Sequence, residues 1–160
     1  MISQFSGAVF DYTGRYRFLL WRFWDERPRV LFVGLNPSTA NEVSNDPTVR
    51  RLVSFAERWD YGGFYLCNIF GYCTAYPKEL FKSQALHAAN LPAIQMANRL
   101  TVASVLIWGD GIEKAEGGRE IAEHVKNLVV PSFCFGLTQN GNPKHPLYLP
   151  NDAQLMDLEV

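Results

Sequence analysis

Four short apolar runs along the chain have the pattern of buried β-strands. They cover residues 30–35, 64–70, 104–108 and 132–135. Each run is nearly continuous in apolar residues rather than alternating, which is typical of strands buried on both faces of a parallel sheet. Glycine or a Gly-rich turn marks the points where these strands should stop.

Helical patterns separate the four runs. Residues 47–59 place their apolar side chains on one helical face, and Asp46 before Pro47 has the form of an N-cap followed by an N1 proline. Residues 91–102 and 119–128 fill the other two gaps in the same way. This alternation predicts an α/β fold, a three-layer α/β/α sandwich with a central, mostly parallel four-stranded sheet.

The pattern leaves the structure of residues 8–24 open. This aromatic-rich segment fits either a hairpin added to the sheet or a helix that covers it. The chain has 160 residues, of which 48% are apolar, enough for one hydrophobic core and too few for two. The sequence shows no repeat, low-complexity tract or long linker. We therefore predict a single domain over residues 1–160.

Composition argues against several classes of protein. No stretch approaches the about 20 consecutive apolar residues of a membrane span, and no basic segment precedes an apolar run at the amino terminus. We therefore predict a cytoplasmic protein with no membrane partner. Cys67, Cys73 and Cys134 are an odd number without metal-ligand spacing, so we expect no disulfide framework, no metal and no cofactor. Nothing in the sequence points to an obligate protein partner.

The formal net charge of −1 argues against strong, charge-driven binding to nucleic acid, because neutralising phosphates normally requires a surplus of Lys and Arg. A local basic face stays open. Five arginines stand near the start of the chain: Arg15, Arg17, Arg22, Arg27 and Arg29. We favour scattered, solvated side chains over a phosphate-binding stripe.

Polar residues gather where the predicted strands end. In an open parallel sheet, ligands bind outside the carboxyl ends of the strands. The polar and turn residues at those ends are Asn36, Pro37, Ser38, Thr39, Asn68, Gly109, Asp110, Thr138, Asn142, Lys144 and His145. We place the candidate site there, with Gly34-Leu35-Asn36-Pro37 lining it.

Three of these residues have both a structural and a functional interpretation. The Asn68 amide lies inside an apolar strand, so it either bonds loop backbone or meets a ligand, and it complements the edge of a nucleobase. Asn36 either caps the following turn or faces a substrate. His145 lies between two prolines that restrict the backbone and fix the direction of its imidazole, although a loop histidine alone is usually a surface residue.

Four motifs, taken in chain order, resemble the uracil-DNA glycosylase superfamily. Gly34-Leu35-Asn36-Pro37 is similar to the superfamily's first motif, a turn that positions the hydrolytic water. Residues 64–68 are similar to a strand that ends in a base-reading asparagine, here Asn68, and residues 105–109 resemble the L-L-W-G strand. His145-Pro146 resembles the terminal H-P motif. The resemblance implies the corresponding fold, with His145 contacting the base oxygen as negative charge develops.

A second resemblance covers nearly the whole chain. The chain resembles a largely bacterial and phage family known as domain of unknown function 1643, on the strength of residues 16–18, 35–40, 46–51 and 141–148. That family has no assigned activity. The expected chemistry therefore comes from the glycosylase resemblance.

A hydrolase hypothesis built on this resemblance gives a role to each candidate residue. Asn36 and His145 are the expected catalytic residues, as water holder and as donor to the departing base. The expected substrate-binding residues are Gly34, Leu35, Pro37, Ser38, Asn68, Tyr72 and Lys144, with Arg50 and Arg51 on nucleic-acid phosphates. An amide at position 36 orients water without accepting its proton, so hydrolysis should be slow. The turn at Asn140-Gly141 must fold His145 back over the strand ends.

The leading hypothesis is a DNA glycosylase-like hydrolase that cleaves the N-glycosidic bond of a nucleobase, modified or not, in flipped-out DNA or a smaller nucleotide. Two alternatives stay open. One is a non-catalytic binding module for modified or single-stranded nucleic acid, and the other is a base-modifying transferase on the same fold. A glycosylase releases free base, a binding module only retards DNA, and a transferase needs a second substrate.

Overall fold

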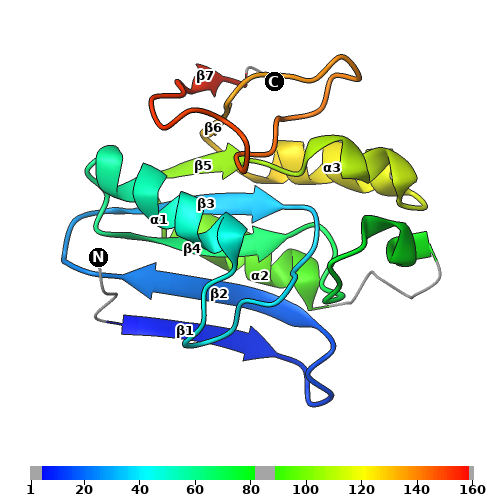
Figure 1. Cartoon of the computed structure of the whole chain (residues 1–160), viewed down its shortest axis with the longest axis horizontal. Helices are drawn as coiled ribbons and strands as arrows, with labels where there is room; N and C mark the ends of the chain where they lie inside the picture. Colours follow the sequence, from blue (N-terminus) through cyan, green and yellow to red (C-terminus); the bar gives the residue numbers. More distant parts are fainter. Residues whose placement is uncertain (1–4, 82–88, 159–160) are drawn as a thin grey trace.

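Seven strands form one mixed β-sheet in the computed structural model, which describes residues 5–81 and 89–158 (Figure 1). The strands are β1 (Phe5–Phe10), β2 (Arg17–Phe23), β3 (Arg29–Gly34), β4 (Gly63–Asn68), β5 (Ala103–Leu106), β6 (Ser132–Cys134) and β7 (Met156–Asp157). Their order across the sheet is β1-β2-β4-β3-β5-β6-β7.

The prediction of a four-stranded sheet was wrong in its size. The four predicted strands are present as β3 to β6, and β4-β3-β5-β6 pair in parallel. The segment left open by its periodicity forms the hairpin β1-β2, and β2 pairs with β4 antiparallel. At the other edge, β7 pairs with β6 antiparallel. Both additions cover strand edges of the parallel unit that would otherwise leave backbone groups unpaired.

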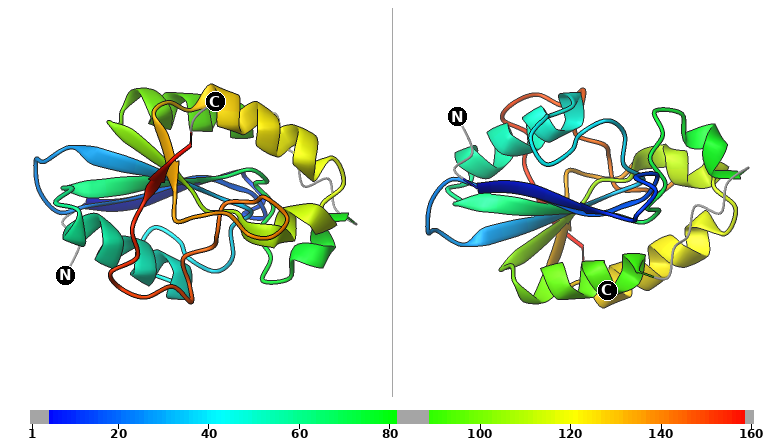
Figure 2. Two further views of the ribbon diagram at one scale, coloured as in Figure 1. Left: turned by 90° about the horizontal axis from the view of Figure 1, so that it is seen from above. Right: turned by 90° about the horizontal axis from the view of Figure 1, so that it is seen from below.

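Helices cover both faces of the sheet (Figure 2). Helix α1 (Pro47–Arg58) lies on one face, and α2 (Asn90–Arg99) and α3 (Gly118–Leu128) lie on the other. Two short 3₁₀ helices, η1 (Pro77–Phe81) and η2 (Gly109–Lys114), complete the connections. Helix α1 starts at the predicted residue, because the Asp46 carboxylate accepts a hydrogen bond from the Val49 amide at 2.8 Å and caps the helix.

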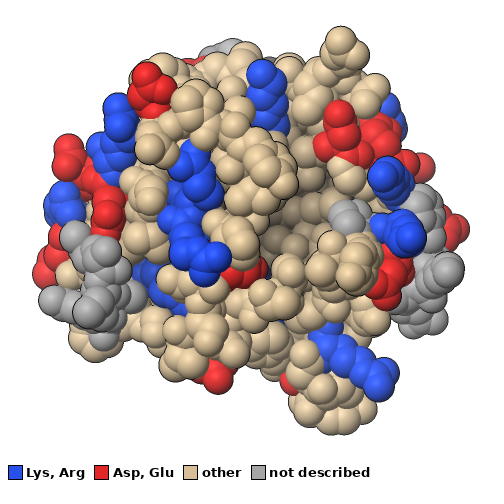
Figure 3. Space-filling model, in the orientation of Figure 1, with Lys and Arg blue, Asp and Glu red and all other residues tan. Residues whose placement is uncertain are grey.

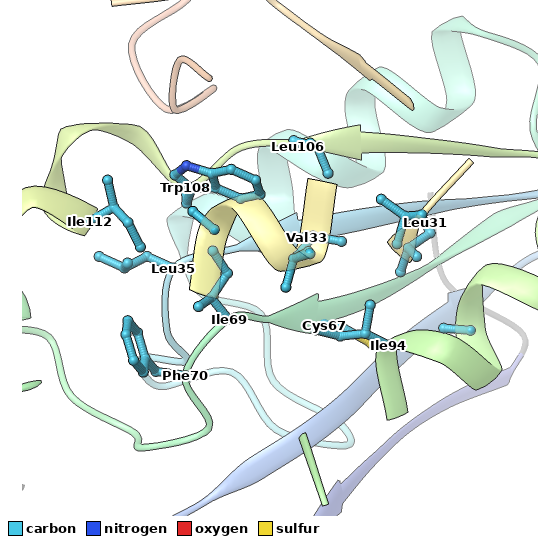
Figure 4. Close-up of a cluster of buried hydrophobic side chains, with 14 of the residues drawn as sticks. Leu31, Val33, Leu35, Cys67, Ile69, Phe70, Ile94, Leu106, Trp108 and Ile112 are labelled. Carbon is cyan, nitrogen blue, oxygen red and sulfur yellow. The ribbon is translucent and has the colours of Figure 1, made fainter. Parts of the chain in front are cut away.

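Side chains alternate between the two faces of the sheet and build a core on each side. Leu31 and Val33 of β3 pack toward α2 and α3, whereas Val30 and Phe32 pack toward α1. Figure 4 shows part of the first cluster, where Cys67 and Leu106 of the neighbouring strands lie beside the β3 side chains. Because β3 is buried on both faces, the carboxyl ends of the parallel strands are held in a rigid frame.

Two further findings concern the described part of the chain. No helix within it has the length and apolar character needed to cross a membrane. Groups of three or more side chains suited to holding a metal ion are absent from the same residues, and Cys67, Cys73 and Cys134 are all free thiols.

Candidate functional site

A pocket of about 260 Å³ lies at the carboxyl ends of β3, β4 and β5. The space-filling view shows a hollow beyond these strand ends, surrounded mainly by uncharged atoms (Figure 3). The pocket is lined by Arg17, Gly34, Leu35, Asn36, Ser38, Asp46, Thr48, Leu66, Asn68, Ile107, Trp108, Gly109, Asp110, Gly111 and His145. Eight residues that the sequence placed at the candidate site are among them: Gly34, Leu35, Asn36, Ser38, Asn68, Gly109, Asp110 and His145. Residues from five separate segments of the chain, at positions 17, 34–48, 66–68, 107–111 and 145, therefore meet in one place.

Asn36 lines the pocket with its amide oxygen available. Its Nδ2 donates to two backbone carbonyls, that of Pro37 at 2.9 Å and that of Thr74 at 2.8 Å. Because both partners are acceptors, they fix the orientation of the amide. Among the described residues no group donates to Oδ1, so this oxygen remains free to accept a hydrogen bond from a water or a ligand.

Asn68 is held in place by a buried arginine. Nη2 of Arg17 donates to the Asn68 Oδ1 at 3.3 Å, and Nη1 of Arg17 donates to the Ala40 carbonyl at 2.9 Å. This leaves Nδ2 of Asn68 as the donor that faces the pocket. Gly34 makes room for it, because a Cβ at position 34 would lie only 2.8 Å from that nitrogen. The glycine of the Gly34-Leu35-Asn36-Pro37 turn is therefore required by the close approach of the amide.

Two buried, oppositely charged residues, Arg17 and Asp46, line the same pocket. Arg17 is 2% exposed, and burial lowers the pKa of its guanidinium while the charge of Asp46 opposes that shift. Asp46 is 8% exposed and also lines the pocket. Its second carboxylate oxygen accepts a hydrogen bond from the Ala40 amide at 3.3 Å. Arg17 and Asp46 thus fix the strand β2 and the loop before α1 around the same pocket.

The predicted turn at Asn140-Gly141 brings His145 to the pocket. Leu137 and Pro143 form an antiparallel bridge on either side of the turn, and Gly141 has a φ of +82°. The Gly109 amide then donates to the Pro143 carbonyl at 2.8 Å, which docks the hairpin on the end of β5. His145 thus lines the same pocket as Asn36 and Asn68, which is the condition that the glycosylase resemblance sets for this turn.

Side chains of η2 lock the hairpin in this position. The Asp110 carboxylate accepts hydrogen bonds from the Thr138 hydroxyl at 2.6 Å and from Asn142 Nδ2 at 2.9 Å. These bonds, led by that of Thr138, hold the pKa of Asp110 below its usual value. The Asn142 amide also donates to Glu113 at 3.0 Å. The hairpin therefore has a fixed place relative to the end of β5.

The His145 ring has a defined tautomer. The Leu147 amide donates to the Nδ1 of His145 at 3.2 Å, so the neutral ring carries its proton on Nε2. Although the residue is exposed at the pocket rim, the surrounding protein lowers the pKa of the imidazole by desolvation, and the charge of Asp46 opposes that shift. At neutral pH the imidazole is therefore uncharged, and its Nε2–H is a donor available to the pocket.

Stability should depend on pH through His145. Because its folded-state pKa is lowered, the unfolded chain binds more protons just below the unfolded value of about 6.5. The contribution of His145 is thus complete above that value and is lost as the pH falls through the interval between the two pKa values. Urea unfolding at pH 7.5 and 5 should show a larger loss of unfolding free energy for the wild type than for His145→Gln. Equal losses would contradict a neutral imidazole whose pKa is lowered in the folded protein.

Three residues expected to bind substrate do not line the pocket. The Tyr72 ring packs edge-on against Tyr16, with centroids 5.7 Å apart, and joins the core beside α2 and α3. Pro37 is buried, and its carbonyl accepts a hydrogen bond from the Thr74 amide at 2.9 Å. Lys144 is exposed, with its side chain alongside Gly136. The sequence places these three residues near strand ends, but it does not determine the direction in which their side chains point.

The two arginines expected on phosphates differ from each other. Arg51 donates to the carbonyls of Pro146 and Leu149 and to the Asn151 side chain, and its guanidinium lies 4.8 Å from the Phe55 ring centroid. It therefore holds the segment that follows His145. Arg50 is exposed and donates to a single carbonyl, that of Asn45, at 3.0 Å. Of the two, Arg50 keeps more donors free for a phosphate, because the structure gives it one hydrogen bond and Arg51 three.

The five arginines near the start of the chain were interpreted as solvated side chains. This interpretation was wrong for Arg17 and Arg22. Each is 2% exposed. Arg22 donates to the carbonyls of Asn41 and Ser44 and to the Asn45 side chain, so it fastens the loop between β3 and α1. Neither interpretation from the sequence, solvated side chain or phosphate-binding stripe, describes these two residues.

Sequence reasoning missed two charged residues of the pocket. Arg17 stood within an apolar strand, a signal that a buried cation needs partners elsewhere. Asp46 was recognised only as a helix cap, although a cap at the carboxyl edge of a sheet lies where ligands bind. Thr48, the second residue of α1, and Trp108, two residues after the end of β5, also line the pocket.

Comparison with known proteins gives one family. No curated protein matches the chain, and no solved structure matches it. A family model described as protein of unknown function, DUF1643, matches residues 17–147, which include Arg17, Asn36, Asp46, Asn68 and His145. This match covers most of the chain, and the chain therefore belongs to the DUF1643 family.

Proposed function

We propose that this protein hydrolyses the N-glycosidic bond of a nucleobase, with the chemistry and the strand arrangement of a uracil-DNA glycosylase. One observation carries the proposal. Side chains from the ends of β3 and β4 and from the hairpin that follows β6 present an acceptor, Asn36 Oδ1, and two donors, Asn68 Nδ2 and His145 Nε2, to one pocket. This set matches what the reaction requires at the sugar and at the base.

The chemistry makes separate demands on the two ends of the scissile bond. The departing base gains negative charge, which a donor such as His145 Nε2–H stabilises more in the transition state than in the ground state. The sugar becomes cation-like and needs a positioned water, which Asn36 Oδ1 is free to hold. Asn68 Nδ2 reads an acceptor on the base. The uncharged imidazole suits this role because it binds an oxygen without adding a full charge to the ground state.

The size of the pocket favours a small ligand group. Its volume of about 260 Å³ lies just below the about 300 to 1,000 Å³ that is typical of small-molecule sites. A base flipped out of DNA, or a smaller nucleotide, is the class of substrate we infer. Basic side chains lie over α1 (Figure 3). The exposed Arg50 and Arg58 belong to this helix, which supports contacts with a phosphate backbone.

A second candidate function is a non-catalytic module that binds a modified nucleotide or single strand. Its support is the commitment of the Asn36 amide to two carbonyls, because an amide so held cannot accept a proton from water. The same pocket would then recognise a base and leave it attached.

Release of free base distinguishes these functions. Wild-type protein would be incubated with normal and with hypermodified phage DNA, and the filtrate analysed for bases by mass spectrometry. We expect free base from at least one of these DNAs, and none from the double variant Asn36→Ala/His145→Ala, which controls for contaminating enzymes. DNA that is retarded in a gel with no base released would support the binding module, and release that requires a second substrate would support a transferase.

A further inference from the structure

The pocket contains a buried carboxylate to which the proposed function gives no role. Asp46 is 8% exposed, yet it lines the same pocket as Asn36, Asn68 and His145. Its position as N-cap explains one hydrogen bond of the carboxylate, to the Val49 amide. Serine, threonine or asparagine would cap α1 equally well. The cap alone therefore does not explain why a charged residue lies at this point of the pocket.

The hydrolytic water needs a proton acceptor that position 36 cannot supply. The Asn36 Nδ2 donates to the Pro37 and Thr74 carbonyls, and a carboxylate there would set oxygen against oxygen at both contacts. The amide at this position is thus imposed by the surrounding backbone. If the reaction has a general base, that base must come from another lining residue.

Hydrogen bonds hold the Asp46 carboxylate in place, and its negative charge influences two other ionisable groups of the pocket. One carboxylate oxygen accepts from Val49 at 2.8 Å and the other from Ala40 at 3.3 Å, so the group is held rigidly. Each oxygen has lone pairs beyond these single bonds. Its charge raises the pKa of both Arg17 and His145 against the effect of burial. The carboxylate lines the pocket together with Arg17, which holds Asn68, and with His145 at the rim.

The other carboxylate of the pocket is less suited to the role. Asp110 is exposed, and one of its oxygens already accepts from both Thr138 and Asn142. Those hydrogen bonds fasten the hairpin that carries His145. Hydrogen bonding also holds the pKa of Asp110 below its usual value, which makes it a weaker proton acceptor.

We propose that Asp46 is the general base of this site, a role that rests on the proposed hydrolysis. The oxygen of the water held by Asn36 forms a bond to C1′ of the sugar as the bond from C1′ to the base nitrogen breaks. The electron pair of that bond leaves with the base, whose oxygen is hydrogen-bonded to His145 Nε2–H. One water proton passes to the Asp46 carboxylate, and the base anion takes up a proton from solvent. Asp46 then returns its proton to solvent, so that water has added across the bond.

The substitution Asp46→Asn tests this role without removing the helix cap, because asparagine is as good an N-cap as aspartate. We expect the single-turnover rate of base release to fall by about 10²- to 10⁴-fold, the usual contribution of a general base. The dissociation constant for DNA should change by no more than several-fold. Asp60→Asn is the matched control, because it makes the same change at the other end of α1 and asparagine tolerates the positive φ of that position, 63°.

A second measurement does not depend on activity. Because the Asp46 charge raises the pKa of His145, an NMR titration of Asp46→Asn should give a His145 pKa below that of the wild type. Asp46→Ser, which also keeps a cap, replaces Asp46→Asn if the latter unfolds. An unchanged His145 pKa, or base release as fast as in the wild type, would overturn the role of Asp46 alone. A wild-type protein that releases no base overturns the proposed function and this role with it.

Discussion

Replacing His145 by alanine should lower the single-turnover rate of base release by about 10²- to 10³-fold, the usual effect of losing one transition-state donor. The reason lies in the tautomer. The Leu147 amide occupies Nδ1, so Nε2–H is the donor available to a base oxygen, and that hydrogen bond strengthens as the base becomes an anion. Binding of intact DNA should change little, because the ground-state oxygen carries less charge.

Asn68→Ala is the matched comparison for this prediction. Asn68 contacts the base before and during the reaction, so its loss should weaken DNA binding and relax the choice of base. Rates and dissociation constants measured for both variants on one oligonucleotide would separate the two roles. If His145→Ala weakened binding as much as it slowed release, or left release unchanged, the histidine would not be the transition-state donor.

Asn36→Asp should destabilise the protein rather than improve it as a catalyst. The change removes two hydrogen bonds and places a carboxylate against the carbonyls of Pro37 and Thr74. Two lost hydrogen bonds and the repulsion of these oxygens should cost about 2 to 4 kcal/mol in the free energy of unfolding. Urea denaturation measures this loss.

Asn45→Asp provides the contrast for that measurement. The Asn45 side chain accepts a hydrogen bond from Arg22 Nε at 2.9 Å through its oxygen, so an aspartate there keeps the contact. Its stability should stay within about 0.5 kcal/mol of the wild type. An Asn36→Asp variant that is as stable as Asn45→Asp and releases base faster than the wild type would contradict the orientation of the Asn36 amide.

The parallel part of the fold could be predicted because its signals are local. The strand at residues 30–35 is a continuous apolar run that appears as β3, and Asp46-Pro47 marks the start of α1. The antiparallel additions lack such signals. Arg17 and Arg22 interrupt the apolar pattern of β2, and β7 is only two residues long. What stabilises those strands is pairing with distant partners, which periodicity does not record.

The candidate site could be predicted as far as the strand ends determine it. Asn36 and Asn68 lie at the carboxyl ends of adjacent parallel strands, so the topology itself brings them together. His145 was singled out by the resemblance of His145-Pro146 to the H-P motif, and the turn at Asn140-Gly141 had to bring it to the strand ends. Tyr72 and Lys144 did not join the pocket, because the backbone path after a strand decides where each side chain points.

The charged residues of the pocket depend on contacts that no local pattern shows. Arg17 bonds Asn68, 51 positions further along the chain. Such a contact forms only after β2 has paired with β4, a pairing that the sequence left open. The roles of Arg17 and Asp46 therefore become visible only in the folded chain, even though both residues lie in segments that the motif analysis had singled out.

A crystal structure with an uncleavable substrate tests the nucleobase pocket most directly. A 2′-fluoro nucleotide serves as this substrate, because fluorine disfavours the cation-like sugar and keeps the bond intact. We expect the base inside the pocket, with its polar edge within about 2.6 to 3.2 Å of Asn68 Nδ2 and of His145 Nε2, and a water between Asn36 Oδ1 and C1′. A base bound elsewhere, or a pocket that excludes the base while the nucleotide binds at the surface, would contradict the account.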